Sequence, residues 1–277
     1  MGLAFFFASL HVLFIPTDVT ILQSLRYYMW FLISTGFIAF FYRTVLGMFI
    51  VRGRSFIVER VDTITKNVIE IFLRPEDGKP MRYYPGQFIF IGFPGTASLE
   101  EVHPFSISSS PDNSSLAFSI KALGDFTTSL LNLKAGTRAV IEGPFGRSSY
   151  RYYGTKEQIW IAGGIGITPF LGMARSLKHD DGYKVDLYYS ALSVEDAAFH
   201  DELSRISTTN PNFRFIPWYG KEKGYLSAES IIKESGGVLG KEIFVCGPPP
   251  MMKSLKQQFA KYKVPTGNIH SEEFSLN

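Results

Sequence analysis

Long apolar runs occupy the first fifty residues of the chain. Residues 27–42 contain no charged side chain, and beyond Arg43 the apolar run continues to Val51. With a helical rise of about 1.5 Å per residue, a helix over 27–51 is long enough to cross a hydrocarbon core of about 30 Å with some tilt. A buried amphipathic helix is the alternative, but the apolar positions surround this segment instead of following one face. We therefore expect a membrane-spanning helix here.

A shorter apolar run precedes this segment. It covers residues 2–15, which is short for a full span, and residues 16–18 break it. We expect residues 1–51 to form a helical hairpin that is only part of a transmembrane region. Arg52 and Arg54 follow, and the positive-inside rule then places the rest of the chain in the cytoplasm. The expected localisation is the membrane, with cytoplasmic domains.

Short strand-like runs separated by turn residues fill the middle of the chain. Such runs, rich in apolar and aromatic residues and bounded by Gly, Pro, Asp or Asn, predict strands. They cover residues 55–61, 68–74, 86–93, 103–110, 116–123 and 137–143. One helical patch, 125–134, interrupts them. Six short antiparallel strands are typical of a small β-barrel, which we assign to residues 52–153.

From about Thr155 the pattern changes to an alternation of strands and helices. The predicted strands cover 158–163, 184–191, 213–220 and 242–247, and the predicted helices cover 168–179, 195–206, 227–235 and 250–262. This alternation predicts a parallel sheet with helices on its faces, a doubly wound α/β domain over residues 154–277. The expected architecture is therefore multidomain: a helical hairpin, an antiparallel barrel and an α/β domain.

Composition excludes several classes of protein. The 28 basic and 25 acidic residues leave a net charge of +3, which shows no basic excess of the kind that nucleic-acid binding needs, so we expect no nucleic-acid partner. A single cysteine, Cys246, allows no intrachain disulfide. It also excludes zinc sites built on cysteine pairs and four-cysteine iron–sulfur clusters.

A glycine-rich turn follows the first strand of the predicted parallel sheet. Gly163, Gly164 and Gly166 lack Cβ atoms, so the backbone can turn tightly and approach a ligand closely. We expect Thr168 to be the N-cap of the next helix, with Pro169 at its first position. A helix N-terminus of this kind attracts an anion. A purely structural turn is the alternative, and the position at a carboxyl strand end favours phosphate binding.

A later strand repeats this arrangement. Cys246 and Gly247 end the predicted strand 242–247, and Pro248 leads from it into a helix. Because carboxyl ends of parallel strands lie at one edge of the sheet, Cys246 is expected near whatever the glycine turn binds. An inert buried thiol is the alternative for this cysteine.

Two stretches of the barrel half add candidate ligand contacts. In residues 103–110 an aromatic ring alternates with hydroxyl groups, although a half-buried strand often has this pattern. In residues 121–128 a strand passes through Gly124 into a short helix, which is a second potential anion site. Its candidate donors are Lys121, Thr127 and Thr128.

Taken in order, these stretches resemble a known family. The segments YPGQF, HPFSISS, KALGDFTT, EGPFG, GGIGITPF, CGPPPMM and EEF resemble the ferredoxin-reductase-type flavoprotein superfamily over residues 54–274. The HPFSISS version after apolar helices is similar to the ferric reductase and NADPH oxidase branch, where a transmembrane haem domain precedes the flavin and nicotinamide domains. The resemblance implies FAD and either NADPH or NADH as cofactors. It also implies a relay in which a hydride reaches the flavin and electrons leave singly.

The resemblance further implies roles for individual residues. The implied catalytic set is Ser106 near flavin N5, Cys246 beside the nicotinamide, Glu272 as the C-terminal acid, and Phe274 as the ring that covers the flavin. The other implied flavin contacts are His103, Pro104, Phe105, Lys121, Gly124, Thr127 and Thr128. The implied nicotinamide contacts are Gly163, Gly164, Gly166, Thr168, Pro169, Cys246, Gly247 and Pro248.

Haem is a further implied partner, through His11. This histidine lies in an apolar segment and aligns with a haem ligand of the ferric reductase domain; a polar residue at the membrane edge is the alternative. No other histidine precedes His103, and the upstream helices of that domain are absent. We therefore expect an N-terminally truncated haem domain. A b-type haem is expected only if a separate membrane segment supplies the missing helices.

The main hypothesis is thus a membrane-associated oxidoreductase that passes electrons from NAD(P)H through FAD towards a haem and a terminal acceptor, either ferric chelate or dioxygen. One alternative is a flavin reductase component that feeds a separate protein acceptor. Another is a non-catalytic, membrane-attached cofactor-binding subunit. The choice between NADPH and NADH stays open, because Ser190, Ser193, Lys221 and Lys223 suit a phosphate whereas Glu195 and Asp196 suit a ribose.

Overall fold

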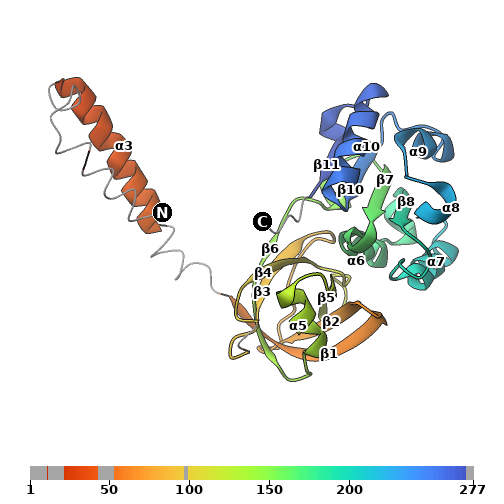
Figure 1. Ribbon diagram of the computed structural model, residues 1–277, viewed down its shortest axis with the longest axis horizontal. Helices are drawn as coiled ribbons and strands as arrows, with labels where there is room; N and C mark the ends of the chain where they lie inside the picture. The colour runs from red at the N-terminus through yellow and green to blue at the C-terminus, as the bar shows by residue number, and fades with distance from the viewer. Residues whose placement is uncertain (1–10, 12–21, 43–52, 97–98, 273–277) are drawn as a thin grey trace. The chain divides into compact units, whose positions relative to one another are not determined.

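A computed structural model describes residues 11, 22–42, 53–96 and 99–272 of the 277-residue chain. The chain divides into two compact units, residues 1–52 and 53–277 (Figure 1). The first unit contains helix α3, Gln23–Phe41, whose sequence holds no proline. In the part of the chain that the structure describes, no helix is both long and apolar enough to cross a membrane. Most of the predicted hairpin, including residues 43–51, lies outside the described residues.

The second unit begins with a six-stranded antiparallel sheet. Its strands are β1 (Arg54–Thr65), β2 (Val68–Pro75), β3 (Phe88–Gly92), β4 (His103–Ser106), β5 (Leu116–Lys121) and β6 (Arg138–Phe145), in the order β4-β3-β6-β1-β2-β5. A bridge between Ile107 and Phe118 joins the two edge strands and closes the sheet into a barrel. The barrel core is built from alternate strand positions such as Phe56, Ile71 and Ile89. The predicted antiparallel barrel is confirmed.

A five-stranded parallel sheet follows. Its strands are β7 (Glu157–Gly163), β8 (Lys184–Ala191), β9 (Phe213–Tyr219), β10 (Glu242–Cys246) and β11 (Ile269–Ser271), in the order β11-β10-β7-β8-β9. From β7 the chain adds β8 and β9 on one side and then returns to place β10 on the other. Strand order therefore reverses at β7, and the crevice at its carboxyl end is where such sheets bind ligands.

Helices cover both faces of this sheet, as predicted (Figure 1). On β7, Trp160 and Ala162 belong to the core that holds α6 (Thr168–Ser176) and α7 (His200–Thr209). Ile159 and Ile161 point the other way, into the core beneath α9 (Ala228–Glu234) and α10 (Pro249–Lys261). The strand is apolar on both faces because both faces are covered.

Two predicted helices have other bounds than expected. The helix predicted over 195–206 begins only at His200, because Phe199 adopts a φ of +64°, which a right-handed helix does not allow. The patch predicted over 125–134 is helical only as α5, Asp125–Ser129, and continues as a 3₁₀ turn over Leu130–Asn132.

Candidate active site

The main cavity lies where the ends of β7 and β10 meet the barrel. Cys246 pairs with Ala162 across these two neighbouring parallel strands, so both strand ends open on the same side. The cavity has a volume of about 440 Å³. Its lining combines Pro104, Phe105, Ser106, Ser119, Ile120, Lys121, Leu123 and Thr127 from the barrel half with Gly163, Gly164, Ile165, Gly166, Thr168, Pro169, Cys246, Gly247, Pro248, Pro249 and Met252 from the parallel half.

Glycines let two backbone segments touch at this cavity. A Cβ atom on Gly166 would lie 2.5 Å from the carbonyl oxygen of Cys246, and one on Gly247 would lie 3.0 Å from the Cα atom of Gly163. On Gly163 it would lie 2.8 Å from Pro248 Cδ. The backbone contact at Gly166 excludes a side chain there, and the contacts at Gly163 and Gly247 leave little room for one. The two loops therefore form one cradle, in agreement with the expectation that Cys246 lies near the glycine turn.

The turn itself differs from the prediction in one respect. Residues Gly164–Ile167 form a 3₁₀ turn, and Thr168 is already the first residue of α6, with Ile167 at the N-cap. The Thr168 hydroxyl donates to the carbonyl oxygen of Ile165 at 2.8 Å. The prediction of Thr168 as the N-cap was wrong, because the 3₁₀ turn starts the helical conformation one residue earlier. Pro169 remains within the first turn, where its missing N–H costs nothing.

The barrel side of the cavity presents one ring and buried hydroxyls. Phe105 packs against Phe118 with ring centroids 5.2 Å apart. Ser106 and Ser119 are both buried and line the cavity. His103 does not line it; its ring lies 3.9 Å from the Phe126 ring, and its Nε2 lies 3.4 Å from Glu101 Oε2. His103 therefore supports the strand from the α5 side.

The segment 121–128 reaches the cavity through Lys121, Leu123 and Thr127. Gly124 is the N-cap of α5. The hydroxyl of Thr127 accepts hydrogen bonds from the N–H groups of Leu123 and Gly124 and donates to the Gly124 carbonyl. This hydroxyl is thus occupied in the turn, so Thr127 holds the segment in shape. Neither Gly124 nor Thr128 lines the cavity.

Two groups have raised pKa values here: the buried thiol of Cys246, which lines the cavity, and the partly buried carboxyl of Glu272. Burial, with the nearby charge of Glu272, raises the pKa of the Cys246 thiol to about 12, so the thiol stays protonated at neutral pH. Burial also raises the pKa of Glu272 to about 7, despite backbone N–H donors at Ser148 and Arg147. Its Oε2 atom is buried without a hydrogen-bond partner among the described residues. Glu272 does not line the main cavity, and Phe274 lies outside the described residues.

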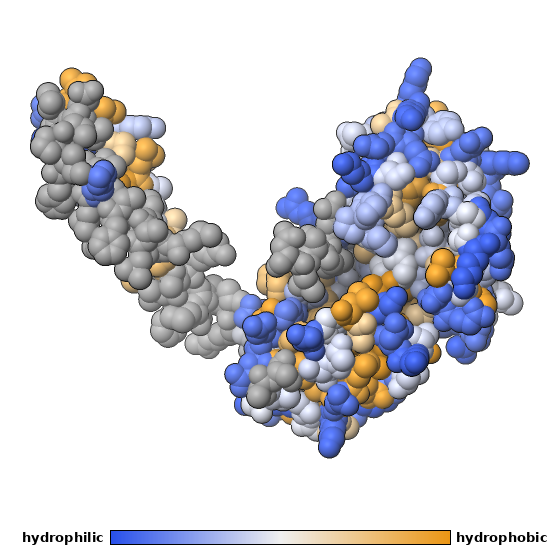
Figure 2. All heavy atoms as spheres, in the orientation of Figure 1, coloured by the Kyte–Doolittle hydropathy of each residue, from blue (hydrophilic) through white to orange (hydrophobic). Residues whose placement is uncertain are grey.

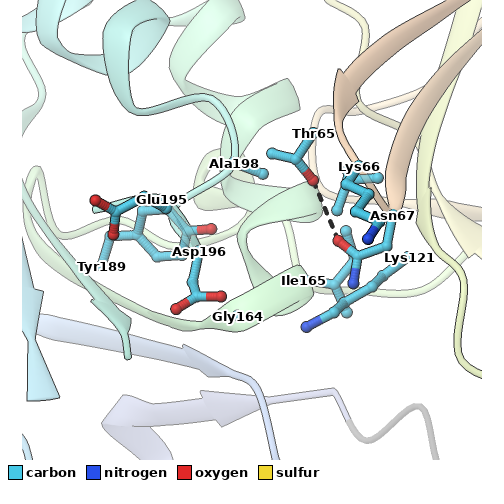
Figure 3. Close-up of a pocket in the computed structure, with 11 residues that line it drawn as sticks. Thr65, Lys66, Asn67, Lys121, Gly164, Ile165, Tyr189, Glu195, Asp196 and Ala198 are labelled. Atoms are coloured by element: carbon cyan, nitrogen blue, oxygen red, sulfur yellow. Dashed lines mark hydrogen bonds between the residues drawn. The ribbon is translucent and has the colours of Figure 1, made fainter. Parts of the chain in front are cut away.

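A second cavity, of about 480 Å³, continues from the same turn along the sheet edge. Figure 3 shows Lys66, Asn67 and Lys121 on its barrel side, facing Asp196 and Tyr189 across the turn. The Tyr189 hydroxyl is buried and finds no hydrogen-bond partner in the described part of the chain. Cations on one wall and an acid with a hydroxyl on the other suit a ligand that carries both phosphates and sugar hydroxyls.

These features fit a flavin and a nicotinamide dinucleotide. The glycine cradle leaves room for a phosphate next to backbone, and Phe105 offers a ring. In the second cavity the Tyr189 hydroxyl has no hydrogen-bond partner among the described residues, so it is available to a ligand. Sequence reasoning missed Ser119, Ile120, Leu123, Ile165, Pro249 and Met252 as lining residues. Leu123, Ile165, Pro249 and Met252 lie inside the motifs already described, and Ser119 and Ile120 directly precede Lys121 on β5. The alternation along strands and the starts of helices could have indicated them.

A barrel and a parallel nucleotide-type sheet that share one cavity define a two-domain flavin and nicotinamide oxidoreductase. Comparison with known proteins agrees: residues 54–149 match an FAD-binding domain, and residues 160–257 match an oxidoreductase NAD-binding domain. The chain belongs to the ferredoxin-reductase-type family of NAD(P)H-dependent FAD oxidoreductases.

Relatives span several contexts. The chain is 32% identical over 211 residues to the glycine betaine monooxygenase reductase subunit of Chromohalobacter salexigens, covering 69% of this chain and 56% of that protein. It is 27% identical over 239 residues to flavohemoprotein A of Dictyostelium discoideum, covering 80% and 60%. The FAD/NAD-binding domain of a nitric oxide dioxygenase from Vibrio cholerae superposes with a TM-score of 0.69 at 23% identity, covering 80% of this chain and 98% of that one. The chain therefore spans less than two thirds of the length of the reductase subunit and of flavohemoprotein A.

Proposed function

We propose that this chain is the reductase part of an electron-transfer system, which takes electrons from NAD(P)H and passes them to a separate acceptor protein. The observation that carries the proposal is that the barrel and the glycine turn together line the main cavity. A relative named as a monooxygenase reductase subunit supports this choice over the ferric reductase hypothesis. FAD, when bound, supplies the chemistry of accepting a hydride and releasing electrons one at a time.

In this proposal the residues of the chain bind and orient the two cofactors and exclude water from between them. Phe105 would face the flavin ring and Ser106 its edge, while Lys121 would balance phosphate charge. The glycine cradle would hold the dinucleotide at the carboxyl ends of β7 and β10. The Cys246 thiol stays protonated and packs as a small neutral group, and Glu272 can hold a proton on its carboxylate near neutral pH.

The test is steady-state oxidation of NADH and NADPH by the purified, FAD-loaded chain with a dye as acceptor. We expect flavin-dependent turnover, whereas protein that neither binds flavin nor turns over would contradict the oxidoreductase assignment and favour a non-catalytic subunit. Adding ferric chelate, dioxygen or an iron–sulfur acceptor protein in turn then identifies the acceptor. A rate with the acceptor protein no higher than that with ferric chelate or dioxygen would contradict the reductase-component proposal.

A membrane-attached form is the second candidate, and the surface of α3 favours it. Large apolar side chains are exposed along this helix, with Tyr27 61%, Phe31 66% and Ile38 69% exposed, and Figure 2 shows apolar residues there. In this proposal the first unit attaches the enzyme to a membrane, the flavin and nicotinamide domains are cytoplasmic, and the acceptor is a haem held in a separate membrane segment. His11 stays a predicted haem ligand. Membrane fractionation and a visible spectrum of the membrane-purified protein test this: protein found only in the soluble fraction, or without haem absorbance when the segment is co-expressed, would contradict it.

Charge in the second cavity is expected to influence coenzyme choice. Asp196 lies there, and NADPH carries a phosphate that NADH lacks. Asp196→Asn removes one negative charge but can still accept the hydrogen bond from Ser193. About 1 kcal/mol of relieved repulsion corresponds to a rise of about fivefold in the ratio of kcat/KM for NADPH to that for NADH. Glu229→Gln, which replaces an exposed residue of α9, is the control. An unchanged ratio in Asp196→Asn would contradict this placement of the phosphate.

A further inference from the structure

One arginine connects the barrel to the helix that follows the glycine turn. Arg175 lies in the last turn of α6. Its guanidinium donates to Glu70 on β2 at 2.6 and 3.1 Å, and to the carbonyl oxygen of Ser108 at 3.0 Å, both in the barrel half. It also donates to Glu202 on α7 at 2.6 and 2.8 Å. The same side chain therefore ties three elements together, two from one half and one from the other.

Every N–H donor of the Arg175 guanidinium is used in this cluster. The five hydrogen bonds use the five N–H donors of a guanidinium, in two bidentate pairs and one backbone contact. Glu70 is 3% exposed and Arg175 16% exposed, so water competes little. Burial alone lowers the pKa of Arg175, but hydrogen bonds and charges from Glu202 and Glu70 outweigh burial and raise it, so the arginine stays charged.

The cluster is linked to both sides of the main cavity through neighbouring residues. Glu70 also accepts hydrogen bonds from the hydroxyls of Ser108 and Ser119, and Ser119 lines the cavity. At the other end, α6 begins with Thr168 and Pro169, which line the same cavity. A fixed position of Glu70 relative to Arg175 therefore fixes the flavin-side strands relative to the nicotinamide-side helix.

The helix α6 packs closely against the backbone of the barrel strand near Arg175. A Cβ atom on Gly172 would lie 2.6 Å from the carbonyl oxygen of Ile107, so α6 sits directly on the strand that follows Ser106. The Ser176 and Ser110 hydroxyls lie 3.3 Å apart at the end of the same contact. A slide of α6 along this strand would therefore have to break the contacts of Arg175 with Glu70 and Ser108.

We propose that Arg175, through its fork to Glu70, is a positioning residue that sets the distance between the flavin and the nicotinamide. Buried ion pairs contribute little net stability compared with apolar packing, so stability alone explains this cluster poorly. Hydride transfer needs reacting atoms about 3–3.5 Å apart, and a misplacement of about 1 Å can cost about a hundredfold in rate. A bidentate fork restricts direction as well as distance.

Two isosteric variants separate positioning from stability. Glu70→Gln weakens the contact of Arg175 between the two halves. Glu202→Gln weakens the same kind of contact of the same arginine, but within the parallel half. The measurements are single-turnover flavin reduction at saturating NADH or NADPH, the KM for that coenzyme, and the charge-transfer absorbance of the flavin–nicotinamide complex. Counting only FAD-loaded protein, we expect Glu70→Gln to slow flavin reduction by about tenfold or more with KM within about twofold. Its charge-transfer band should weaken, and Glu202→Gln should change neither.

The remaining outcomes also decide the matter. Equal effects of the two variants, or a lower melting temperature of Glu70→Gln with an unchanged rate per bound flavin, would overturn the proposal in favour of a structural role. If Glu70→Gln does not load FAD, Arg175→Lys keeps the charge but not the fork and should show the same loss of rate; loss of FAD there too would also mean a structural role. Wild-type protein whose flavin is not reduced would instead fault the assigned oxidoreductase activity.

Discussion

Gly166→Ala is expected to lower kcat/KM for the nicotinamide coenzyme by about a hundredfold while FAD stays bound. The added Cβ would lie 2.5 Å from the carbonyl oxygen of Cys246, 2.7 Å from its carbonyl carbon and 2.8 Å from the Cα atom of Gly247. All three are backbone atoms, which cannot rotate away as a side chain would. The turn and the 246–248 loop must therefore separate, and the cradle opens. Flavin reduction by the coenzyme, with bound FAD measured by absorbance, tests this.

Gly164→Ala is the matched control in the same turn. No atom lies within 4 Å of a Cβ built there, so the substitution meets open space. Its φ of +55° costs an alanine about 1–2 kcal/mol of backbone strain, which affects stability more than ligand geometry. We expect less than about a tenfold loss of kcat/KM. Equal losses in the two variants would show that conformational freedom, and not the contact with Cys246, is what the turn requires.

The comparison of these glycines shows which part of the site the sequence could predict. An apolar strand that stops at Gly163 and a later one that stops at Cys246 are local patterns, and sheet topology brings such ends together. Even the start of α6 was predicted within one residue. The error at Thr168 came from the 3₁₀ turn before it, because the Thr168 hydroxyl donates to the carbonyl oxygen of Ile165 in that turn instead of capping the helix.

Contacts between the two halves could not be predicted in this way. Glu70 and Arg175 are 105 residues apart, and each sits in an ordinary amphipathic or strand pattern. Nothing local distinguishes Glu70 from a solvent-facing glutamate, because its burial depends on how α6 lies against the barrel. Local motifs thus predicted the loops that line the cavity. The contacts that hold the barrel and the parallel half together depend on tertiary packing, which the motifs do not contain.

Glu272→Gln is expected to change how stability depends on pH. Burial raises the pKa of this carboxyl from 4.5 to about 7. Between those values the folded protein binds more protons than the unfolded chain, so the free energy of unfolding falls as pH rises through this window. Above pH 7 the full cost of the buried carboxylate is present, about 2–3 kcal/mol. Glutamine carries no such charge, so the variant should lose less stability between pH 5 and pH 8.

The measurement is urea unfolding of FAD-saturated wild type and variant at pH 5 and pH 8. Other titrating groups are shared, so they cancel in the difference between the two proteins. We expect that difference to shift by about 2 kcal/mol in favour of Glu272→Gln at the higher pH, which is about a thirtyfold change in the unfolding equilibrium. Glu229→Gln, which replaces an exposed carboxylate, should show no shift. If Glu272→Gln shows none either, water or a charged partner reaches the carboxyl, and it cannot hold a proton beside the cavity at neutral pH.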